Sequence, residues 1–336
     1  MQRLNVAQLP PPPPGKTGWP WTVEGTIAPP PGGPEGWPRI SVVTPSFNQG
    51  QYLEETIRSV LLQGYPNLEY MVIDGGSRDE SPAIIERYAP FLSYAVVEPD
   101  RGQSDAIAKG FARATGALMN WLNSDDLLLP GALAALGAAA RANPGAAIAG
   151  DVIRFGVGVK GEPRLRQRGL THENLVKYWT GAAYYQQPGL YFPRAAYEAA
   201  GGVDIGLWNS MDYDLFCRVL RHAPVVYLAQ PLVRFRYHEA SKTVTSGDFF
   251  MRERLRASQR YWPGLVSPAE AREARRYTAR FYARRAVRRL ARGQLGRARA
   301  LFAEAWRLAP GAALSEPWAM SFGYVRRRLP GAGAGA

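Results

Sequence analysis

The chain has 336 residues, of which 46% are hydrophobic and 11% aromatic, so it can bury a large core and is not a disordered sequence. A single cysteine, Cys217, excludes a disulfide within the chain, and a total of three histidines excludes a histidine-rich metal cage. No apolar run reaches the roughly 18 residues of a membrane span, and the N-terminus has neither the basic nor the apolar region of a secretory signal. We therefore expect a cytoplasmic protein.

The formal net charge of +13 lies at one end of the chain. Residues 247–336 contain 19 Arg, no Lys and 6 acidic residues, which accounts for the whole excess, and residues 1–246 are formally neutral. Such a basic region is a solvated surface, a patch for peripheral association with an anionic membrane, or a nucleic-acid patch. We expect no nucleic-acid partner, because the sequence carries no recognition motif for one. The charge therefore says nothing about the ligand of the main domain.

Residues 1–37 are rich in Pro and Gly and contain the runs "LPPPPPGKTGWPWTVEG" and "APPPGGPEGWP". This composition predicts an extended segment that wraps the body of the protein or serves as a leader. The letters "GKT" are not a phosphate loop, because the upstream Gly and the preceding strand are missing.

From Pro38 the sequence alternates between strand and helix patterns. Segments with helical spacing of apolar residues separate four β-rich runs, "RISVVTP", "LEYMVID", "LSYAVVEPD" and "ALMNWLN", and "GAAIAGDVIRF" is a fifth. This predicts an α/β fold with a Rossmann-like, mostly parallel sheet flanked by helices. Ligands of such sheets lie outside the carboxyl ends of the strands. That rule selects four polar loops, namely Thr44–Asn48, Asp74–Ser77, Glu98–Gln103 and Asn123–Asp126.

Beyond residue 160 the pattern is less regular. The run "MDYDLFCRVLRHA" predicts a helix, and "PVVYLAQPLVRFRYHEASKT" predicts two short strands and a loop. The remaining residues predict helices only, with a capping box at Ser267–Glu270 and a helix end at Gly293, as in a helical hairpin. We thus expect a main domain over residues 38–246 and a basic helical region over residues 247–336.

Two adjacent acids, Asp125 and Asp126, directly follow the apolar run 117–122. Carboxylates beside a core need hydrogen-bond donors or a cation. The alternative is a turn that caps the start of the next segment.

Several motifs, in order along the chain, resemble those of family 2 glycosyltransferases with the GT-A fold. They are "VVTPSFNQGQYLEETIRSVLLQGYPNLEYMVIDGGSRDES", "GQSDAIAKGFARATGALMNWLNSDD", "QQPGLYF", "MDYDLFCRVL" and "RYHEASKT", within residues 38–245. The resemblance implies an inverting, metal-dependent enzyme that takes a sugar from a nucleotide-diphosphate donor, with UDP- or dTDP-sugars favoured. It implies a sugar, glycan or lipid-linked acceptor and a role in the synthesis of cell-surface polysaccharide or glycoconjugates.

The resemblance places the donor at the loops selected above. Nucleobase and ribose contacts fall on the first two loops, and the backbone N–H groups that open the helix at "GQSDA" suit a diphosphate. Asp105 in that helix would repel a diphosphate unless it meets the ribose or the metal, and Asp74-Gly75-Gly76 is alternatively a plain turn. The expected donor-binding residues are Thr44, Pro45, Ser46, Asn48, Asp74, Gln103, Asp105, Asp125 and Lys242.

The resemblance also implies Mg²⁺ or Mn²⁺, which would neutralise the charge of a departing diphosphate. Asp126 is the expected direct ligand, and Asp125 is expected nearer the donor ribose or sugar. His238 is expected to complete the coordination or to contact the diphosphate, the alternative being a core histidine.

Two acids on one predicted helix compete for the role of general base. Asp212 shares a face with apolar residues, whereas Asp214 lies four residues before Arg218. We therefore expect Asp212 to be the buried base that deprotonates the acceptor hydroxyl, and Asp214 to form a structural ion pair. By elimination the acceptor falls to the aromatic stretch 184–191 and to Trp208.

Other functions stay open on the sequence. A nucleotidyltransferase can share the sheet and the metal acids, but it would not need Asp212 as a base. A non-catalytic scaffold could dock a partner through the basic helices, and a donor-hydrolysis assay would distinguish it from an enzyme. A dinucleotide-dependent dehydrogenase is disfavoured, because no G-x-G-x-x-G follows the first strand.

Overall fold

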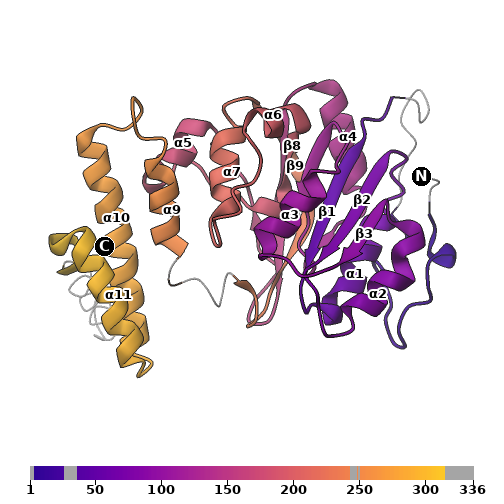
Figure 1. Cartoon of the computed structure of the whole chain (residues 1–336), viewed down its shortest axis with the longest axis horizontal. Helices are drawn as coiled ribbons and strands as arrows, with labels where there is room; N and C mark the ends of the chain where they lie inside the picture. The colour runs from indigo at the N-terminus through magenta and orange to yellow at the C-terminus, as the bar shows by residue number, and fades with distance from the viewer. Residues whose placement is uncertain (1–3, 26–35, 243–247, 249, 315–336) are drawn as a thin grey trace, which may run out of the picture. The chain divides into compact units, whose positions relative to one another are not determined.

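The computed structural model describes residues 4–25, 36–242, 248 and 250–314. The chain divides into two compact units, Met1–Leu175 with Ala182–Ser241 and Val176–Gly181 with Lys242–Ala336 (Figure 1). A short piece of the main domain, Val176–Gly181, thus joins the second unit. The boundary expected at residue 246 stays a prediction.

The first unit is built on a nine-stranded sheet. Its strands are β1 (Ile40–Ser46), β2 (Leu68–Asp74), β3 (Tyr94–Val97), β4 (Leu118–Trp121), β5 (Leu127–Leu128), β6 (Ala147–Gly156), β7 (Arg164–Leu165), β8 (Leu190–Pro193) and β9 (Val225–Tyr237). The order is β3-β2-β1-β4-β8-β6-β9-β5, and β7 pairs with β6. Strands β3, β2, β1 and β4 are parallel, β8 is antiparallel to both neighbours, and β6 and β9 are parallel. The predicted α/β class with a mostly parallel sheet is confirmed.

The fifth predicted strand is β6, which belongs to the sheet with β8 between it and β4. One detail of the sheet differs from the sequence-based expectation. The run expected to form two short strands is one continuous strand, β9. Its pairing register with β6 shifts on both sides of Asp151, and β9 continues through this irregularity. Pro231, which cannot donate a ladder hydrogen bond, lies at that irregularity, where its missing N–H is tolerated.

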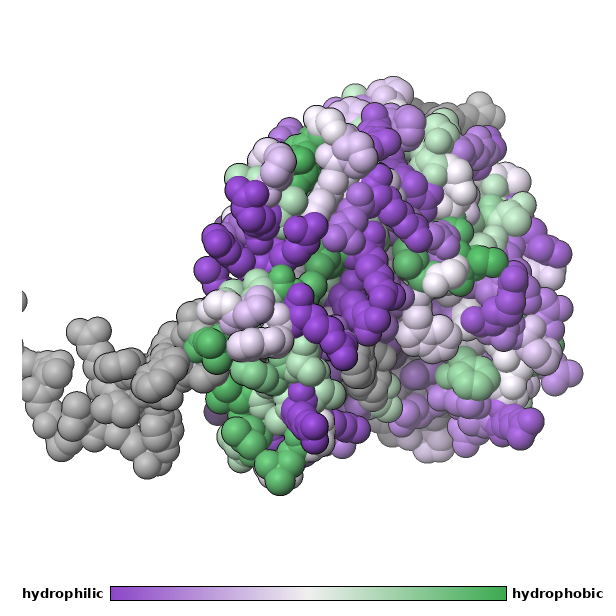
Figure 2. Space-filling model, turned by 60° about the vertical axis from the view of Figure 1, so that its left-hand side comes forward, coloured by the Kyte–Doolittle hydropathy of each residue, from purple (hydrophilic) through white to green (hydrophobic). Residues whose placement is uncertain are grey.

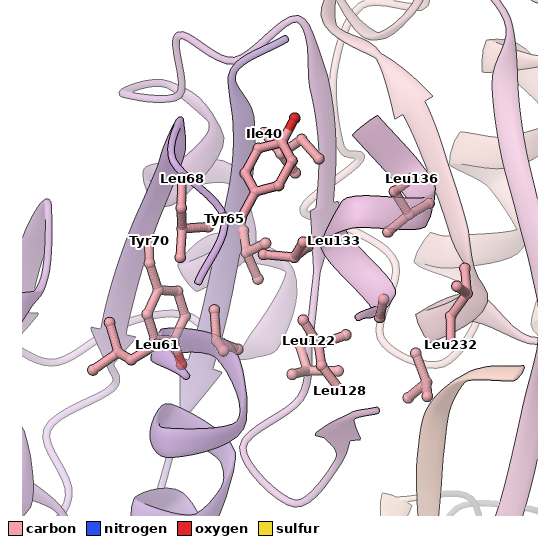
Figure 3. Close-up of a cluster of buried hydrophobic side chains, with 14 of the residues drawn as sticks. Ile40, Leu61, Tyr65, Leu68, Tyr70, Leu122, Leu128, Leu133, Leu136 and Leu232 are labelled. Carbon is pink, nitrogen blue, oxygen red and sulfur yellow. The ribbon is translucent and has the colours of Figure 1, made fainter. Parts of the chain in front are cut away.

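Helices cover both faces of the sheet (Figure 1). They are α1 (Gly50–Leu61), α2 (Ser81–Tyr88), α3 (Gln103–Phe111), α4 (Ala132–Ala142), α5 (His172–Val176), α6 (Arg194–Ala199) and α7 (Met211–Val219). Helices α1, α2 and α4 share one core with β1 and β2, in which Leu61, Tyr70 and Leu133 are buried (Figure 3). On the other face Phe111 of α3 and Phe216 of α7 pack against Trp121 of β4.

Alternation along β1 explains the two layers. Ile40 and Val42 belong to the core with α1, whereas Val43 points to the opposite face. A Cβ at Gly110 of α3 would come within 2.5 Å of Val43 Cγ1, so glycine lets this helix approach the strand closely. The carboxyl ends of β1, β2 and β4 consequently lie at one edge between two helical layers.

The second unit contains α9 (Phe250–Gln259), α10 (Pro268–Leu290) and α11 (Leu295–Leu308). The capping box predicted at the start of α10 is present, and Gly293, with φ 72°, follows its end. Helices α10 and α11 form the predicted hairpin and pack through small residues, including Ala283, Ala286 and Ala305. In the part of the chain that the structure describes, no helix is long and apolar enough to cross a bilayer.

Candidate active site

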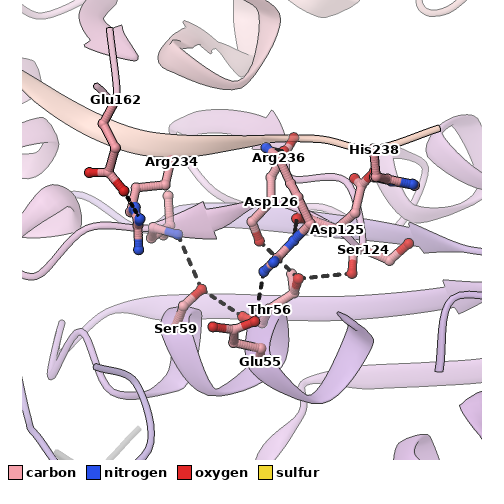
Figure 4. A network of polar contacts seen from close by, with 11 residues as sticks. Glu55, Thr56, Ser59, Ser124, Asp125, Asp126, Glu162, Arg234, Arg236 and His238 are labelled. Carbon is pink, nitrogen blue, oxygen red and sulfur yellow. Dashed lines mark hydrogen bonds and ion pairs between the residues drawn. The ribbon is translucent and has the colours of Figure 1, made fainter. Parts of the chain in front are cut away.

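One face of α1 holds the acid loop, which we define as residues 123–129 (Figure 4). Thr56 Oγ1 lies 2.9 and 2.8 Å from two carbonyl oxygens of the loop, toward which it donates. Ser59 Oγ accepts a loop N–H at 3.1 Å, and Gln63 Nε2 donates to another loop carbonyl at 2.9 Å. Thr56 and Ser59 lie on one face of α1, and Gln63 continues this polar stripe just past the end of the helix. Sequence reasoning missed the stripe, because backbone partners leave no signal in the sequence.

Within this loop Asp125 faces His238, which follows β9 (Figure 4). His238 Nε2 lies 2.9 Å from Asp125 Oδ2, and the two side chains are 6% and 18% exposed. Tyr52 of α1 packs on the imidazole, with ring centroids 4.9 Å apart. A carboxylate oxygen and an imidazole nitrogen this close together can bind the same divalent cation.

Asp126 has a different environment from Asp125. It is fully buried, its Oδ1 accepts the backbone N–H of Arg236 at 2.9 Å, and its Oδ2 accepts from Asn123 Nδ2 at 3.2 Å. Burial first, and then the charge of Asp125, raise the pKa of Asp126 well above its usual value. The expected role of Asp126 as the direct metal ligand stays a prediction, and Asp125 is the more exposed of the two acids.

Arg236, a residue without a role in the sequence analysis, connects both acids to α1. Its Nε donates to the Asp125 carbonyl oxygen at 2.9 Å, and its Nη2 bonds Glu55 Oε2 at 2.6 Å. The guanidinium lies 4.7 Å from the ring centroid of Tyr52. Because Arg236 also bonds Asp126 through its own N–H, it fixes the position of both acids. The available signal was its place at the start of the motif "RYHEASKT".

Three of the predicted donor residues, Thr44, Pro45 and Ser46, are buried at the carboxyl end of β1. Thr44 Oγ1 lies 3.0 Å from Tyr70 Oη. Ser46 Oγ is buried without a hydrogen-bond partner among the described residues. An unsatisfied buried hydroxyl at the ligand edge of a sheet suits a contact with a bound molecule.

The loops after β1 and β2 meet through polar residues. Asn48 N–H donates to Ser77 Oγ at 2.7 Å, and Asn48 Oδ1 accepts from the N–H of Arg78 at 2.9 Å. Asp74 is fully buried and accepts from Gly76 N–H at 3.1 Å and from the N–H and hydroxyl of Ser77 at 2.7 Å each. The turn that was the alternative reading of Asp74 is thus present, and its contact with a donor stays a prediction.

The start of α3 connects to the acid loop. Gln103 Nε2 donates to Asn123 Oδ1 at 2.8 Å. Asp105 accepts from the N–H and the Nη2 of Arg101, at 3.1 and 2.8 Å. The hydrogen bond from the Arg101 side chain lowers the pKa of Asp105. Arg101 therefore offsets the carboxylate charge that would otherwise repel an anion at this helix start.

The loop before α7 packs on the same helix start. Ser104 Oγ donates to the Leu207 carbonyl oxygen at 2.7 Å. A Cβ at Gly102 would come within 2.5 Å of the Trp208 ring, and Trp208 is 55% exposed. An exposed indole next to Gln103 offers an apolar face of the kind on which sugars pack.

The structure corrects one prediction about the acids of α7. Asp214, not Asp212, is the buried one, and Arg218 Nε and Nη2 donate to Asp214 Oδ2 at 3.0 and 2.7 Å, which confirms the expected ion pair. Asp212 is half-buried and accepts from Tyr185 Oη at 3.2 Å and from the N–H of Tyr213 at 2.7 Å. The expectation failed because the loop after α6 covers Arg218 and buries the ion pair.

The other predicted residues are not brought to this edge by the described contacts. Lys242 belongs to the second unit, so its contact with a donor stays a prediction. Tyr191, in the aromatic stretch expected to bind the acceptor, is part of the core. Among the described residues no three His, Cys, Asp or Glu side chains form a group that could hold a metal ion by themselves.

Comparison with known proteins gives the family. Residues 41–200, which run from β1 through α6 and include the acid loop, match the model of glycosyl transferase family 2. The matching segment, just under half of the chain, belongs to this family. The expected recognition is confirmed.

The curated relatives are similar to this chain over a limited segment. Rv1514c of Mycobacterium tuberculosis, an uncharacterized glycosyltransferase, is 42% identical over 88 residues, which cover 26% of this chain and 34% of the relative. TuaG of Bacillus subtilis, a glycosyltransferase assigned to teichuronic acid biosynthesis, is 35% identical over 90 residues, 26% of this chain and 36% of the relative. The chain thus spans about a third of the length of these relatives.

Solved structures align with a larger part of the chain than these curated relatives do. TarS 1–349 of S. aureus in complex with UDP aligns with a TM-score of 0.52 and 18% identity, over 73% of this chain and 71% of TarS. The mannosyltransferase PcManGT from Pyrobaculum calidifontis in complex with GDP-Man and Mn²⁺ aligns with a TM-score of 0.53 and 19% identity, over 85% of this chain and 81% of PcManGT. These likenesses show a shared fold of GT-A type.

Proposed function

We propose that this family 2 glycosyltransferase moves a sugar, with inversion, from a UDP- or dTDP-sugar to a hydroxyl acceptor in the synthesis of a cell-surface polysaccharide or glycoconjugate. The observation that carries the proposal is the meeting of polar loops at the carboxyl ends of β1, β2 and β4 beside the Asp125–His238 pair. The UDP and GDP-Man complexes of proteins with the same fold support a nucleotide-sugar donor. The assignment of TuaG supports a polysaccharide product.

The donor would lie across three loops. Its nucleoside would meet the residues after β1 and β2, where Ser46 Oγ can satisfy its hydrogen bond on the ligand. Its diphosphate would meet the backbone N–H groups that open α3 at Gln103. Lys242 is a further candidate for the diphosphate through its positive charge.

The residues of the acid loop fit a divalent cation. Asp125 and His238 offer one oxygen and one nitrogen ligand 2.9 Å apart, and the donor diphosphate has the further oxygens that Mg²⁺ or Mn²⁺ requires. A cation held there supplies positive charge for a departing diphosphate. Asp126 and Arg236 would keep the loop in position behind this pair.

The acceptor hydroxyl needs a base, and Asp212 is the proposed one. Its carboxylate would take the proton as the acceptor oxygen attacks the anomeric carbon opposite the diphosphate. Tyr185 donates to Oδ2 of Asp212 and orients it. Trp208, exposed on the adjoining loop, would pack on a sugar face of the bound substrates.

Calorimetric titration of UDP, dTDP and GDP into the full chain, with and without Mn²⁺, tests the donor and the metal pair. We expect Mn²⁺ to tighten binding of at least one nucleotide by roughly tenfold or more. Asp125→Asn should lose this increase while keeping the metal-free affinity. Asp126→Asn is the matched control and should keep the increase but lower the melting temperature, because its hydrogen bonds support the loop.

The outcomes separate the two acids. If Asp126→Asn loses the Mn²⁺ effect at an unchanged melting temperature and Asp125→Asn keeps it, Asp126 is the ligand and the proposal that Asp125 binds the cation is wrong. If none of the three nucleotides binds, with or without Mn²⁺, the proposed donor class is wrong.

A further inference from the structure

The turn between α10 and α11 forms an exposed tip, which we define as residues 287–297. None of these residues is buried, whereas Ala286 and Ala298 on either side are. Leu290 and Leu295 are 55% and 67% exposed. Figure 2 shows hydrophobic side chains gathered at its lower edge. Two leucines are therefore held in water at the end of the hairpin.

Backbone hydrogen bonds define the turn of the tip, and this turn holds the two leucines in position. Gly293 N–H donates to the carbonyl of Leu290 and Gln294 N–H to the carbonyl of Arg289, each at 2.9 Å, the pattern of a glycine-ended helix. The Arg289 side chain bonds Gln294 Oε1 at 3.0 Å and Asp248 Oδ2 at 2.9 Å. These contacts fix the turn that separates Leu290 from Leu295.

The charged residues in the sequence stretch around the leucines are all arginines. Residues 274–303 contain ten Arg and no Asp, Glu or Lys. Three of these arginines, Arg288, Arg292 and Arg297, are exposed within the tip itself. The tip thus combines two exposed leucines with three exposed arginines.

We propose that this tip docks the protein on the surface of an anionic lipid bilayer. Leu290 and Leu295 would enter the boundary between headgroups and acyl chains, and the tip arginines would bind lipid phosphates. A nucleic acid or another soluble polyanion would meet the arginines but leave both leucines in water. A second copy of the hairpin would cover the leucines but bring like charges together. Only an anionic bilayer is complementary to both features, and this proposal does not depend on the donor or the metal.

Co-sedimentation of the full chain with vesicles tests the proposal. We expect binding to phosphatidylglycerol vesicles that weakens with salt, and little binding to phosphatidylcholine vesicles. The triple variant R288Q/R292Q/R297Q should bind roughly 100-fold more weakly, at about fivefold per arginine. The double variant L290S/L295S should bind at least roughly tenfold more weakly, although its net charge is unchanged.

Matched variants distinguish the tip from general electrostatic attraction. R272Q/R276Q/R307Q removes the same charge from exposed positions near the opposite ends of the two helices, and L314S changes an exposed leucine outside the tip. Both should bind nearly as the unchanged protein does. Every variant should also retain its melting temperature and its nucleotide affinity, so that lost vesicle binding reports on the tip.

Three results would overturn the proposal. The first is an equal loss in both arginine triples together with no loss in L290S/L295S, which would indicate non-specific attraction to polyanions. The second is equal binding to phosphatidylcholine and phosphatidylglycerol vesicles. The third is a dimer in light scattering that L290S/L295S dissociates, which would show that the leucines face a second copy.

Discussion

Asp212 and Asp214 lie two residues apart on α7 but have different surroundings. Arg218 holds buried Asp214 through two donors of its guanidinium. An acid bound in this way is not available to take a proton from a substrate. Asp212 is half-buried in the first turn of the helix and is the base that we propose. Neutralising Asp212 should therefore affect turnover, whereas neutralising Asp214 should affect stability.

We expect Asp212→Asn to lower kcat by roughly 10²- to 10⁴-fold, the usual contribution of a general base. The affinity for the nucleotide should stay within about twofold, because a base acts in the chemical step and not in donor binding. Steady-state kinetics with the donor identified by titration, together with calorimetry on the same protein, measure both quantities.

Asp214→Asn is the matched control on the same helix. Removing the charge of Asp214 leaves Arg218 without its carboxylate partner. Breaking a buried ion pair costs about 3 kcal/mol of unfolding free energy. Below its melting temperature this variant should keep a kcat near that of the unchanged protein. If Asp214→Asn lost turnover and Asp212→Asn lost only stability, the proposed base would be the wrong one.

Helical spacing predicted part of this pair correctly. The four-residue separation of Asp214 and Arg218 was enough to predict their ion pair. The burial of that pair was not predictable, because it depends on a carbonyl of the loop after α6, at Gly202, which accepts from Arg218. Contacts between residues near in sequence follow from spacing, whereas burial depends on segments that only the fold brings together.

At the scale of single elements, the start of α10 is fixed by a reciprocal capping box. The Glu270 side chain accepts the N–H of Ser267 at 2.8 Å and pairs with Lys177 Nζ at 2.9 Å. The hydrogen bond from the Ser267 backbone, and next the one from Lys177, lower the pKa of Glu270 to about 2. The helix start is therefore linked to the ionisation of one exposed carboxyl group.

This link predicts a pH dependence. Since the folded-state pKa lies below the ordinary value of 4.5, ionised Glu270 stabilises the fold above about pH 4.5, and the contribution is lost as the pH falls toward 2. Glu270→Gln keeps the capping box but loses the pair with Lys177, so it should lower Tm slightly near neutral pH and not at all at the acid end. Circular dichroism melts of both proteins across this range give the difference. A difference that grows on acidification would contradict the assignment.

The elements themselves were largely predictable, and the exceptions have physical causes. Apolar, β-rich runs marked β1, β2 and β4, and helical spacing marked the helices that follow β1 and β2. The serine and glutamate of the capping box marked α10. Strand β9 was divided in the prediction because a proline inside a strand normally ends it, and the register shift that tolerates Pro231 is a property of the paired strand. The polar stripe of α1 could not be seen, because its partners are backbone atoms of the acid loop.

At the scale of the first unit, residues 4–25 are bound to the sheet domain through a buried arginine. Arg58 of α1 is fully buried and donates to three carbonyl oxygens of this segment, at 2.7, 3.1 and 3.0 Å. Trp19 Nε1 donates to the carbonyl oxygen of Leu128, in the acid loop, at 2.9 Å. Of the two alternatives open on the sequence, these contacts favour a segment that wraps the body.

The charge of Arg58 is compensated by a chain of polar contacts. Its Nη1 donates to Tyr88 Oη at 2.9 Å, and that hydroxyl donates to Glu54 at 2.8 Å. Arg87 pairs with the same glutamate at 2.9 Å. Arg58 therefore serves two functions at once, since it satisfies the backbone of the N-terminal segment and balances a buried carboxylate.

We expect Arg58→Met to release the segment while filling a similar volume. Two buried carbonyls and one partly buried carbonyl lose their donor. Each unsatisfied buried group costs about 1–3 kcal/mol, so the free energy of unfolding should fall by roughly 3 kcal/mol or more. Trypsin should then cut after exposed Lys16 faster than in the unchanged protein, which mass spectrometry of timed digests measures. Arg87→Met is the matched control, because its side chain is 47% exposed and touches the same glutamate, and it should change neither quantity much. If Arg58→Met had the same melting temperature as the unchanged protein and resisted cleavage at Lys16, the arginine would not be what holds the segment. Its apolar residues Leu9 and Trp21 would hold it instead.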